Sequence, residues 1–267
     1  ISLIMGFTPT MVGIMGTISI LIVSLFSYKT RIGLISLAKA LSETCYRIVP
    51  VAGACAAAGL IIGGMTMTGL AGKFAHLVND LTGALQFPTL LVTACLTIVL
   101  GLGMPTPSAY ILSAALMTPI LTEIGVPTLP SHMFVFYYAV MSAITPPVAV
   151  AAYAASSIAE DNPLLIAVSA VKFALAAFIV PFAFIYGPEL LMIGPWYSIL
   201  FSFLTAAIGI VIIASALEAF LKKPLNRWER VLLFILGLGL VMPNFIISLT
   251  CLIISLVYFG RALILKN

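Results

Sequence analysis

The sequence predicts an all-α integral membrane protein, a polytopic helical bundle that contains a re-entrant helical hairpin and a discontinuous helix. Of its 267 residues, 63% are hydrophobic and 7% are charged, and the mean hydropathy is +1.25; soluble domains have about 25% charged residues. The apolar residues form uninterrupted blocks of about 20 residues, which suit membrane helices and not the alternating pattern of membrane strands. Two blocks are interrupted in the middle by glycine, proline and hydroxyl residues, and these interruptions predict the hairpin and the discontinuous helix.

Charge and cysteine usage exclude several other classes of protein. The net charge of +4 comes mainly from two juxtamembrane clusters, Lys29, Arg31, Lys39 and Arg47, and Lys222, Lys223, Arg227 and Arg230. Such clusters indicate which side of the membrane a segment faces. No surface of basic and aromatic residues that could bind nucleic acid accompanies them. The cysteines Cys45, Cys55, Cys95 and Cys251 lack CxxC spacing, so we expect core packing and neither a metal site nor a disulfide framework. No basic segment or cleavage site precedes the apolar start, so we expect no signal peptide and a longer parent polypeptide.

The first 70 residues predict two spans separated by an interfacial helix. The first span covers Ile1–Phe26, and Thr30–Arg47 mixes apolar and basic residues at helical spacing, as an interfacial arm does. The second span, Pro50–Leu70, is rich in glycine, and close packing against a moving partner and ordinary helix packing both explain that composition. We expect His76, in the amphiphilic stretch that follows, to be a surface residue and not a metal ligand.

The segment Leu90–Leu121 carries the most unusual interruption. Its centre reads Gly-Leu-Gly-Met-Pro-Thr-Pro-Ser at 101–108, between two apolar arms of about a dozen residues. At about 1.5 Å per residue each arm reaches roughly half of the ~30 Å hydrocarbon core. This predicts a re-entrant hairpin over about 88–122; the alternative is a single span kinked at Pro105 and Pro107.

A second interruption divides the helix predicted for 131–159. Ser142-Ala-Ile-Thr-Pro-Pro-Val148 lies near the middle of this apolar run, and its two prolines remove two backbone donors. We expect the carbonyl groups before the prolines to lose their intrahelical partners. Together with the hydroxyl groups of Ser142 and Thr145 they are candidate oxygen ligands for a cation. Two successive discontinuous segments match the pattern of secondary transporters.

The remaining apolar blocks complete the predicted bundle. Leu164–Gly187 reads as a span kinked at Pro181, and Lys172 within it either pairs with an anion or acidic group or extends to the interface. Pro195–Ala219 reads as another span, and Val231–Phe259 as either one span or a short hairpin. The expected domains are a scaffold span plus arm helix at 1–47, a transport domain at 48–190 and C-terminal spans at 191–267. Four crossings separate the basic clusters, so both lie on the cytoplasmic side and the hairpin enters from outside.

Three sequence motifs together resemble a known family. They are Gly-Leu-Gly-Met-Pro-Thr-Pro-Ser-Ala-Tyr at 101–110, Phe-Val-Phe-Tyr-Tyr at 134–138 and Ser-Ala-Ile-Thr-Pro-Pro-Val-Ala-Val-Ala-Ala-Tyr at 142–153. In this order they resemble the large membrane (permease) subunit of tripartite ATP-independent periplasmic (TRAP) transporters, most closely the fused permeases of the TAXI type. The resemblance covers roughly Ile1–Glu189, and the tail beyond Lys222 is similar only loosely.

The resemblance implies a sodium-coupled importer of organic acids in the bacterial inner membrane, with an elevator-type repeat like those of the ion transporter superfamily. A periplasmic substrate-binding protein would deliver the organic acid. The implied ion- and substrate-binding residues are Gly101, Gly103, Met104, Pro105, Thr106, Pro107 and Ser108 of the hairpin, and Ser142, Ala143, Thr145, Pro146 and Pro147 of the discontinuous helix. Sodium would bind at Thr106, Ser142 and Thr145, and the helix that begins near Ser108 would favour a carboxylate. No cofactor other than Na+ is implied.

The family's permease has two inverted repeats with a hairpin in each, whereas this sequence shows one hairpin. We therefore expect the C-terminal half of a permease, whose partners in the bilayer are the N-terminal half or a small membrane subunit. One alternative is another ion-coupled carrier or antiporter that needs no binding protein. A further alternative is an intramembrane enzyme using Ser131 and His132, but adjacent helical residues point in different directions and no HExxH or GxSxG motif is present. We expect no enzymatic activity.

Overall fold

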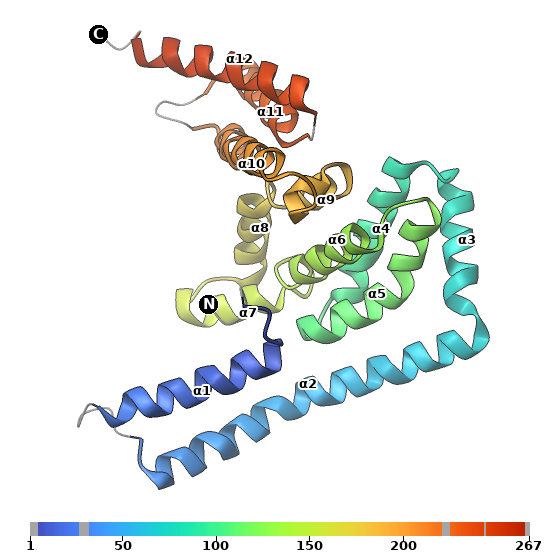
Figure 1. The fold of residues 1–267 in the computed structure, drawn as a ribbon, viewed down its shortest axis with the longest axis vertical. Coiled ribbons are helices and arrows are strands. Elements are labelled where there is room, and N and C mark those ends of the chain that lie inside the picture. The colour runs from blue at the N-terminus through green and yellow to red at the C-terminus, as the bar shows by residue number, and fades with distance from the viewer. Residues whose placement is uncertain (1–4, 27–31, 221–224, 243, 265–267) are drawn as a thin grey trace. The chain divides into compact units, whose positions relative to one another are not determined.

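The computed structural model describes residues 5–26, 32–220, 225–242 and 244–264. Within these ranges every regular element is a helix, as the sequence predicts. The chain divides into two compact units, residues 1–53 and 54–267. Figure 1 labels the elements along the chain.

The first unit contains helix α1 (Pro9–Leu25) and the beginning of helix α2 (Leu34–Thr68). The hydroxyl group of Thr8 caps α1 by accepting a hydrogen bond of 3.4 Å from the amide of Met11. Helix α2 continues through Pro50, so the predicted interfacial arm and second span form one helix of 35 residues and not two elements. Pro50 removes only one intrahelical donor, and the alanine-rich turns that follow it (Ala52, Ala54 and Ala56–Ala58) are good helix formers.

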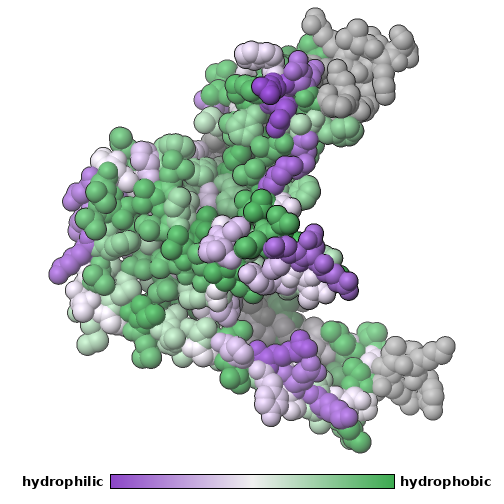
Figure 2. Space-filling model, turned by 180° about the vertical axis from the view of Figure 1, so that it is seen from behind, coloured by the Kyte–Doolittle hydropathy of each residue, from purple (hydrophilic) through white to green (hydrophobic). Residues whose placement is uncertain are grey.

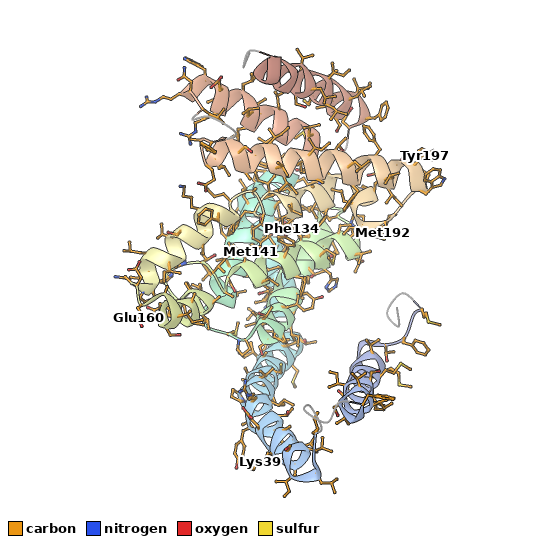
Figure 3. The ribbon with its side chains drawn as sticks, turned by 90° about the vertical axis from the view of Figure 1, so that its left-hand side faces the viewer. Lys39, Phe134, Met141, Glu160, Met192 and Tyr197 are labelled. Carbon is orange, nitrogen blue, oxygen red and sulfur yellow. The ribbon has the colours of Figure 1, made fainter. Side chains whose placement is uncertain are left out.

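The second unit holds its largest core where helices α3 to α6 meet. These helices are α3 (Leu70–Thr82), α4 (Gln86–Gly101), α5 (Thr106–Glu123) and α6 (Thr128–Met141). Phe134 of α6 is fully buried among Leu90 of α4 and Met117 of α5. Figure 3 shows Phe134 and Met141 on the same helix in the interior of this unit.

Helices α7 (Val150–Ala159), α8 (Pro163–Ala174) and α9 (Val180–Tyr186) follow α6. Glu160 lies at the turn between α7 and α8 (Figure 3). The predicted span 164–187 is interrupted by turns between α8 and α9, directly before Pro181, where the sequence predicts a kink. The amide of Val180 bonds to the carbonyl of Ala177, three residues earlier, at 3.2 Å. Val180 precedes Pro181, and a residue before proline disfavours the α conformation.

The C-terminal part consists of a short 3-10 helix (Pro188–Leu191), α10 (Trp196–Leu217), α11 (Arg227–Val241) and α12 (Phe245–Ile264). Helix α10 packs against α11, and α11 packs against α12 (Figure 1). The tail is thus a pair of helices and not one continuous helix. A Cβ atom added to Gly237 would lie 2.9 Å from the carbonyl oxygen of Gly209, so both glycines are needed for this close approach.

Two helices among the described residues, α2 and α10, have the length and apolar composition to cross a membrane. Several shorter helices are also apolar, including α1, α4, α7, α8 and α12. On the face shown in Figure 2, hydrophobic residues predominate and hydrophilic residues gather in a few separate groups. Many large hydrophobic side chains are exposed among the described residues, which suits a surface in contact with lipid.

Candidate functional site: a helix-hairpin tip against an unwound segment

The predicted hairpin is present as two separate helices joined by a tight turn. Helix α4 ends at Gly101, α5 begins at Thr106, and the two helices pack against each other. A single kinked span would not bring its halves into contact, so the structure favours the hairpin. Gly103 in the turn has a φ of +75°, which explains the need for glycine there.

The arms of this hairpin are longer than the sequence suggested. Helix α4 has 16 residues and α5 has 18, not about a dozen. At about 1.5 Å per residue their lengths are about 24 and 27 Å, close to the ~30 Å hydrocarbon thickness. The predicted half-length arms are therefore wrong. The packing of α4 on α5 supports a helix hairpin, and its re-entrant character stays a prediction.

The predicted break in the second helix lies at residues 142–149, between α6 and α7. The Pro146–Pro147 peptide bond is cis. The hydroxyl group of Ser142 donates to the carbonyl of Ala139 at 2.7 Å, and that of Thr145 donates to the carbonyl of Met141 at 2.8 Å. A hydroxyl group that donates its hydrogen in this way still has oxygen lone pairs available for a cation.

The backbone carbonyl groups that lack a hydrogen bond in the break are not the ones that the sequence predicted. The carbonyl groups of Ser142 and Ala143, four residues before the prolines, accept hydrogen bonds from Thr145 and Ala151 at 3.3 and 3.0 Å. In the part of the chain that the structure describes, no hydrogen bond reaches the carbonyl groups of Ile144, Pro146, Pro147 and Val148. These four groups are consequently the unpaired backbone oxygens of the segment.

The hairpin tip and the unwound segment meet directly. A Cβ atom on Gly101 would lie 2.4 Å from the hydroxyl oxygen of Ser142, and one on Gly103 would lie 3.5 Å from a methyl carbon of Val148. Gly101 and Ser142 are both buried. The structure therefore brings together two loops that are about 40 residues apart in the sequence, whereas no hydrogen bond joins Thr106 to Ser142 or Thr145 within the described ranges.

Ser108, near the N-terminus of α5, contacts a residue that the sequence did not single out. Its hydroxyl oxygen lies 3.3 Å from the sulfur of Cys55 on α2, and Ser108 is fully buried. The expectation of core packing is confirmed for Cys251, which is partly buried against the core of α10 and α11, whereas Cys45 and Cys95 are exposed; all four cysteines are free thiols. The sequence did not predict this contact, because it joins residues 53 positions apart.

The sequence model of one protein family matches most of this chain. The family is described as "Tripartite ATP-independent periplasmic transporter, DctM component", and its model matches residues 1–199, about three quarters of the chain. This chain belongs to the DctM family. No curated protein and no solved structure matches it.

Membership of the DctM family makes the chain a membrane component of a TRAP transporter and not an enzyme. The local geometry around the rejected catalytic pair agrees with that assignment. Ser131 donates to the carbonyl of Pro127 at 2.9 Å, while His132 contacts the hydroxyl group of Tyr110 at 2.9 Å. Each side chain has its own structural partner, and the pair is not arranged as nucleophile and base.

Two ionic contacts of the DctM component lie away from the tip. His76 of α3 lies 2.7 Å from Glu123 at the end of α5, and Asn79 donates to the same carboxylate at 2.9 Å. His76 is 72% exposed, in agreement with its prediction as a surface residue. Lys172 lies 3.5 Å from Glu218, so of the two interpretations of this lysine the structure favours a partner for an acidic group.

Proposed function

We propose that this DctM component is the permease of a sodium-coupled importer of organic acids that works by an elevator mechanism. Its sodium site would use the hydroxyl oxygens of Thr106, Ser142 and Thr145, with the turn 101–108 and the break 142–147 as its two sides. The observation that carries the proposal is the direct packing of Gly101 against Ser142. Sodium prefers several oxygen ligands, and hydroxyl and unpaired carbonyl oxygens are concentrated in these two loops.

The carboxylate of the substrate would bind beside the same loops. Helix α5 begins at Thr106, and the partial positive charge at a helix N-terminus attracts anions. The turn from Gly101 to Ser108 contains no lysine or arginine. Backbone dipoles and hydroxyl groups would therefore select an organic acid, together with the bound sodium ion.

The organisation of the complete transporter is also part of this proposal. Residues 1–47 would belong to a fixed scaffold, 48–190 to the moving transport domain, and 191–267 to additional C-terminal spans. A periplasmic substrate-binding protein would deliver the acid to a permease in the bacterial inner membrane, with the hairpin α4–α5 entering from outside. The chain would be the C-terminal half of a TAXI-type fused permease. On α2, an added Cβ atom would meet no atom within 4 Å at Gly59, Gly63 and Gly64. These glycines leave room for a partner helix.

Sodium-dependent uptake by the complete permease, reconstituted with its binding protein, tests the site. Thr106→Ala and Thr145→Ala should each weaken the apparent affinity for sodium about tenfold or more, the effect of losing one good interaction with a charged partner. Thr250→Ala is the matched control, because Thr250 also donates to a helical carbonyl four residues earlier, at 2.9 Å, but lies on α12. Unchanged sodium dependence in both site variants would reject the proposed site.

Whether uptake requires the periplasmic binding protein distinguishes this proposal from the alternative of a carrier that works alone. Uptake should disappear when the periplasmic protein is omitted and return when it is added. Uptake of equal rate without any binding protein would instead support an ion-coupled carrier or antiporter that works alone.

A further inference from the structure

A crevice lined by hydrophobic side chains runs through the second unit beside α11. It consists of three hollows of about 460, 400 and 380 Å³ that share the side chain of Phe234, and we call it the Phe234 crevice. Each hollow lies in the range of about 300–1,000 Å³ that is typical of ligand sites. The first hollow is the most open to the surface and is bordered by α10 and α11.

The hollows are adjacent because neighbouring ones share lining side chains. Leu217 and Phe234 line both the first and the second hollow. Leu91, Ile179 and Phe182 line both the second and the third, together with Phe234. The crevice therefore extends from α10 past the hairpin arm α4 to α9, and its lining is almost entirely aliphatic and aromatic. Water gains few hydrogen bonds in such a space.

The mouth of the Phe234 crevice carries positive charge. Arg227 and Arg230 line the first hollow. Arg230 donates to the carbonyl groups of Ala216 and Leu217 at 3.0 and 3.4 Å, which uses two of its five donors. No ion pair with a carboxylate is found for Arg227 in the described ranges, and Arg227 is exposed.

The acidic groups near this mouth already have partners. Glu218, which follows α10, pairs with Lys172 at 3.5 Å, and the carboxylate of Glu229 accepts from the amide of Asn226 at 2.8 Å. Trp228, next to Arg227, is 81% exposed. An exposed tryptophan beside basic residues is typical of the lipid headgroup level of a membrane helix. The charge and the aromatic residue thus place the mouth where a lipid headgroup would lie.

We propose that the Phe234 crevice binds a phospholipid with an anionic headgroup. The phosphate would lie against Arg227 and the remaining donors of Arg230, and one acyl chain would follow Phe234 into the second and third hollows. A long apolar crevice with a cationic mouth fits this two-part molecule, whereas a small soluble anion would leave the apolar hollows empty. Basic pockets between membrane helices are suited to such headgroups.

Native mass spectrometry of the purified permease, titrated with lipids of identical acyl chains, tests this site. Phosphatidylglycerol should bind more tightly than phosphatidylcholine. Arg227→Gln should lower the affinity for phosphatidylglycerol about fivefold, which is the contribution of one arginine near an anionic lipid. Leu91→Trp, which adds bulk to the wall that the second and third hollows share, should weaken binding of both lipids. Arg47→Gln, an exposed arginine elsewhere, and Leu204→Trp, on a 52% exposed position of α10, are the matched controls and should bind like the wild type.

Three outcomes would overturn the proposal. Equal binding of the two lipids, or wild-type phosphatidylglycerol binding in Arg227→Gln, would reject the headgroup contact. Displacement of phosphatidylglycerol by inorganic phosphate with no effect of Leu91→Trp would indicate a simple anion site. Arg227 lies on the surface, so we expect Arg227→Gln to fold normally. This variant tests the headgroup contact even if Leu91→Trp fails to fold. The measurement requires neither sodium nor substrate, so its result is independent of the proposed transport function.

Discussion

Gly101→Ala is the substitution that most sharply probes contact between the hairpin tip and the unwound segment. The new methyl carbon would lie 2.4 Å from the hydroxyl oxygen and 2.8 Å from the Cβ atom of Ser142. Ser142 cannot remove the clash by rotating, because its Cβ atom stays in place whichever rotamer it adopts. Its hydroxyl group is also held by the carbonyl of Ala139 at 2.7 Å. One of the two loops must therefore move.

The expected magnitude follows from two opposing effects. Inserting a methyl group into a packed interior typically costs about 1–3 kcal/mol. Replacing glycine by alanine within a helix stabilises by up to ~1 kcal/mol, and less for Gly101, which is the last residue of α4. The net effect should be a loss of about 1–2 kcal/mol of stability, or an equivalent separation of the two loops. If sodium binds between them, its apparent affinity should fall about tenfold.

The assay combines thermal unfolding of the purified permease with sodium-dependent uptake. Gly72→Ala is the matched control, because a Cβ atom on Gly72, exposed on α3, meets nothing within 4 Å and should leave both readouts unchanged or slightly raise stability. Adding Ser142→Gly to Gly101→Ala removes the clashing atoms and should restore stability in a double-mutant cycle. If Gly101→Ala behaves like Gly72→Ala in both assays, the two loops are not in contact and the reasoning fails.

Two further substitutions test other parts of the packing. Thr93 of α4 is fully buried, and its hydroxyl oxygen has no hydrogen-bond partner within the described ranges. Thr93→Val should therefore leave stability unchanged or raise it by about 1 kcal/mol. A loss of sodium-dependent uptake in this variant would instead make Thr93 an ion ligand. Gly237→Ala would place a methyl carbon 2.5 Å from Ile213 and 2.9 Å from the carbonyl oxygen of Gly209, so it should lower the unfolding midpoint by about 2–4 °C for each kcal/mol lost. An unfolding midpoint equal to the wild type's would show that α10 and α11 are not packed so closely.

The sequence predicted the local breaks well because their causes are local. Glycine and proline at 101–107 and the paired prolines at 146–147 disrupt helical hydrogen bonding wherever they occur, and the structure has non-helical turns at both places. The predicted boundaries of the hairpin, 88–122, differ from the observed outer ends, Gln86 and Glu123, by only one or two residues.

Features that depend on tertiary contacts could not be read from the sequence. Pro50 looked like the start of a new span, yet the surrounding turns keep α2 helical through it. The carbonyl groups of Ser142 and Ala143 looked free because their helical donors are absent, but Thr145 and Ala151 bind them instead. The contact between Cys55 and Ser108 likewise joins distant segments.

Direct binding of sodium to the purified complete permease is the measurement closest to the central claim. Radioactive sodium should bind saturably to the wild type and to Thr250→Ala, and Thr145→Ala should weaken that binding about tenfold or more. Equal sodium affinity in all three proteins would contradict a site formed by the hairpin tip and the break between α6 and α7.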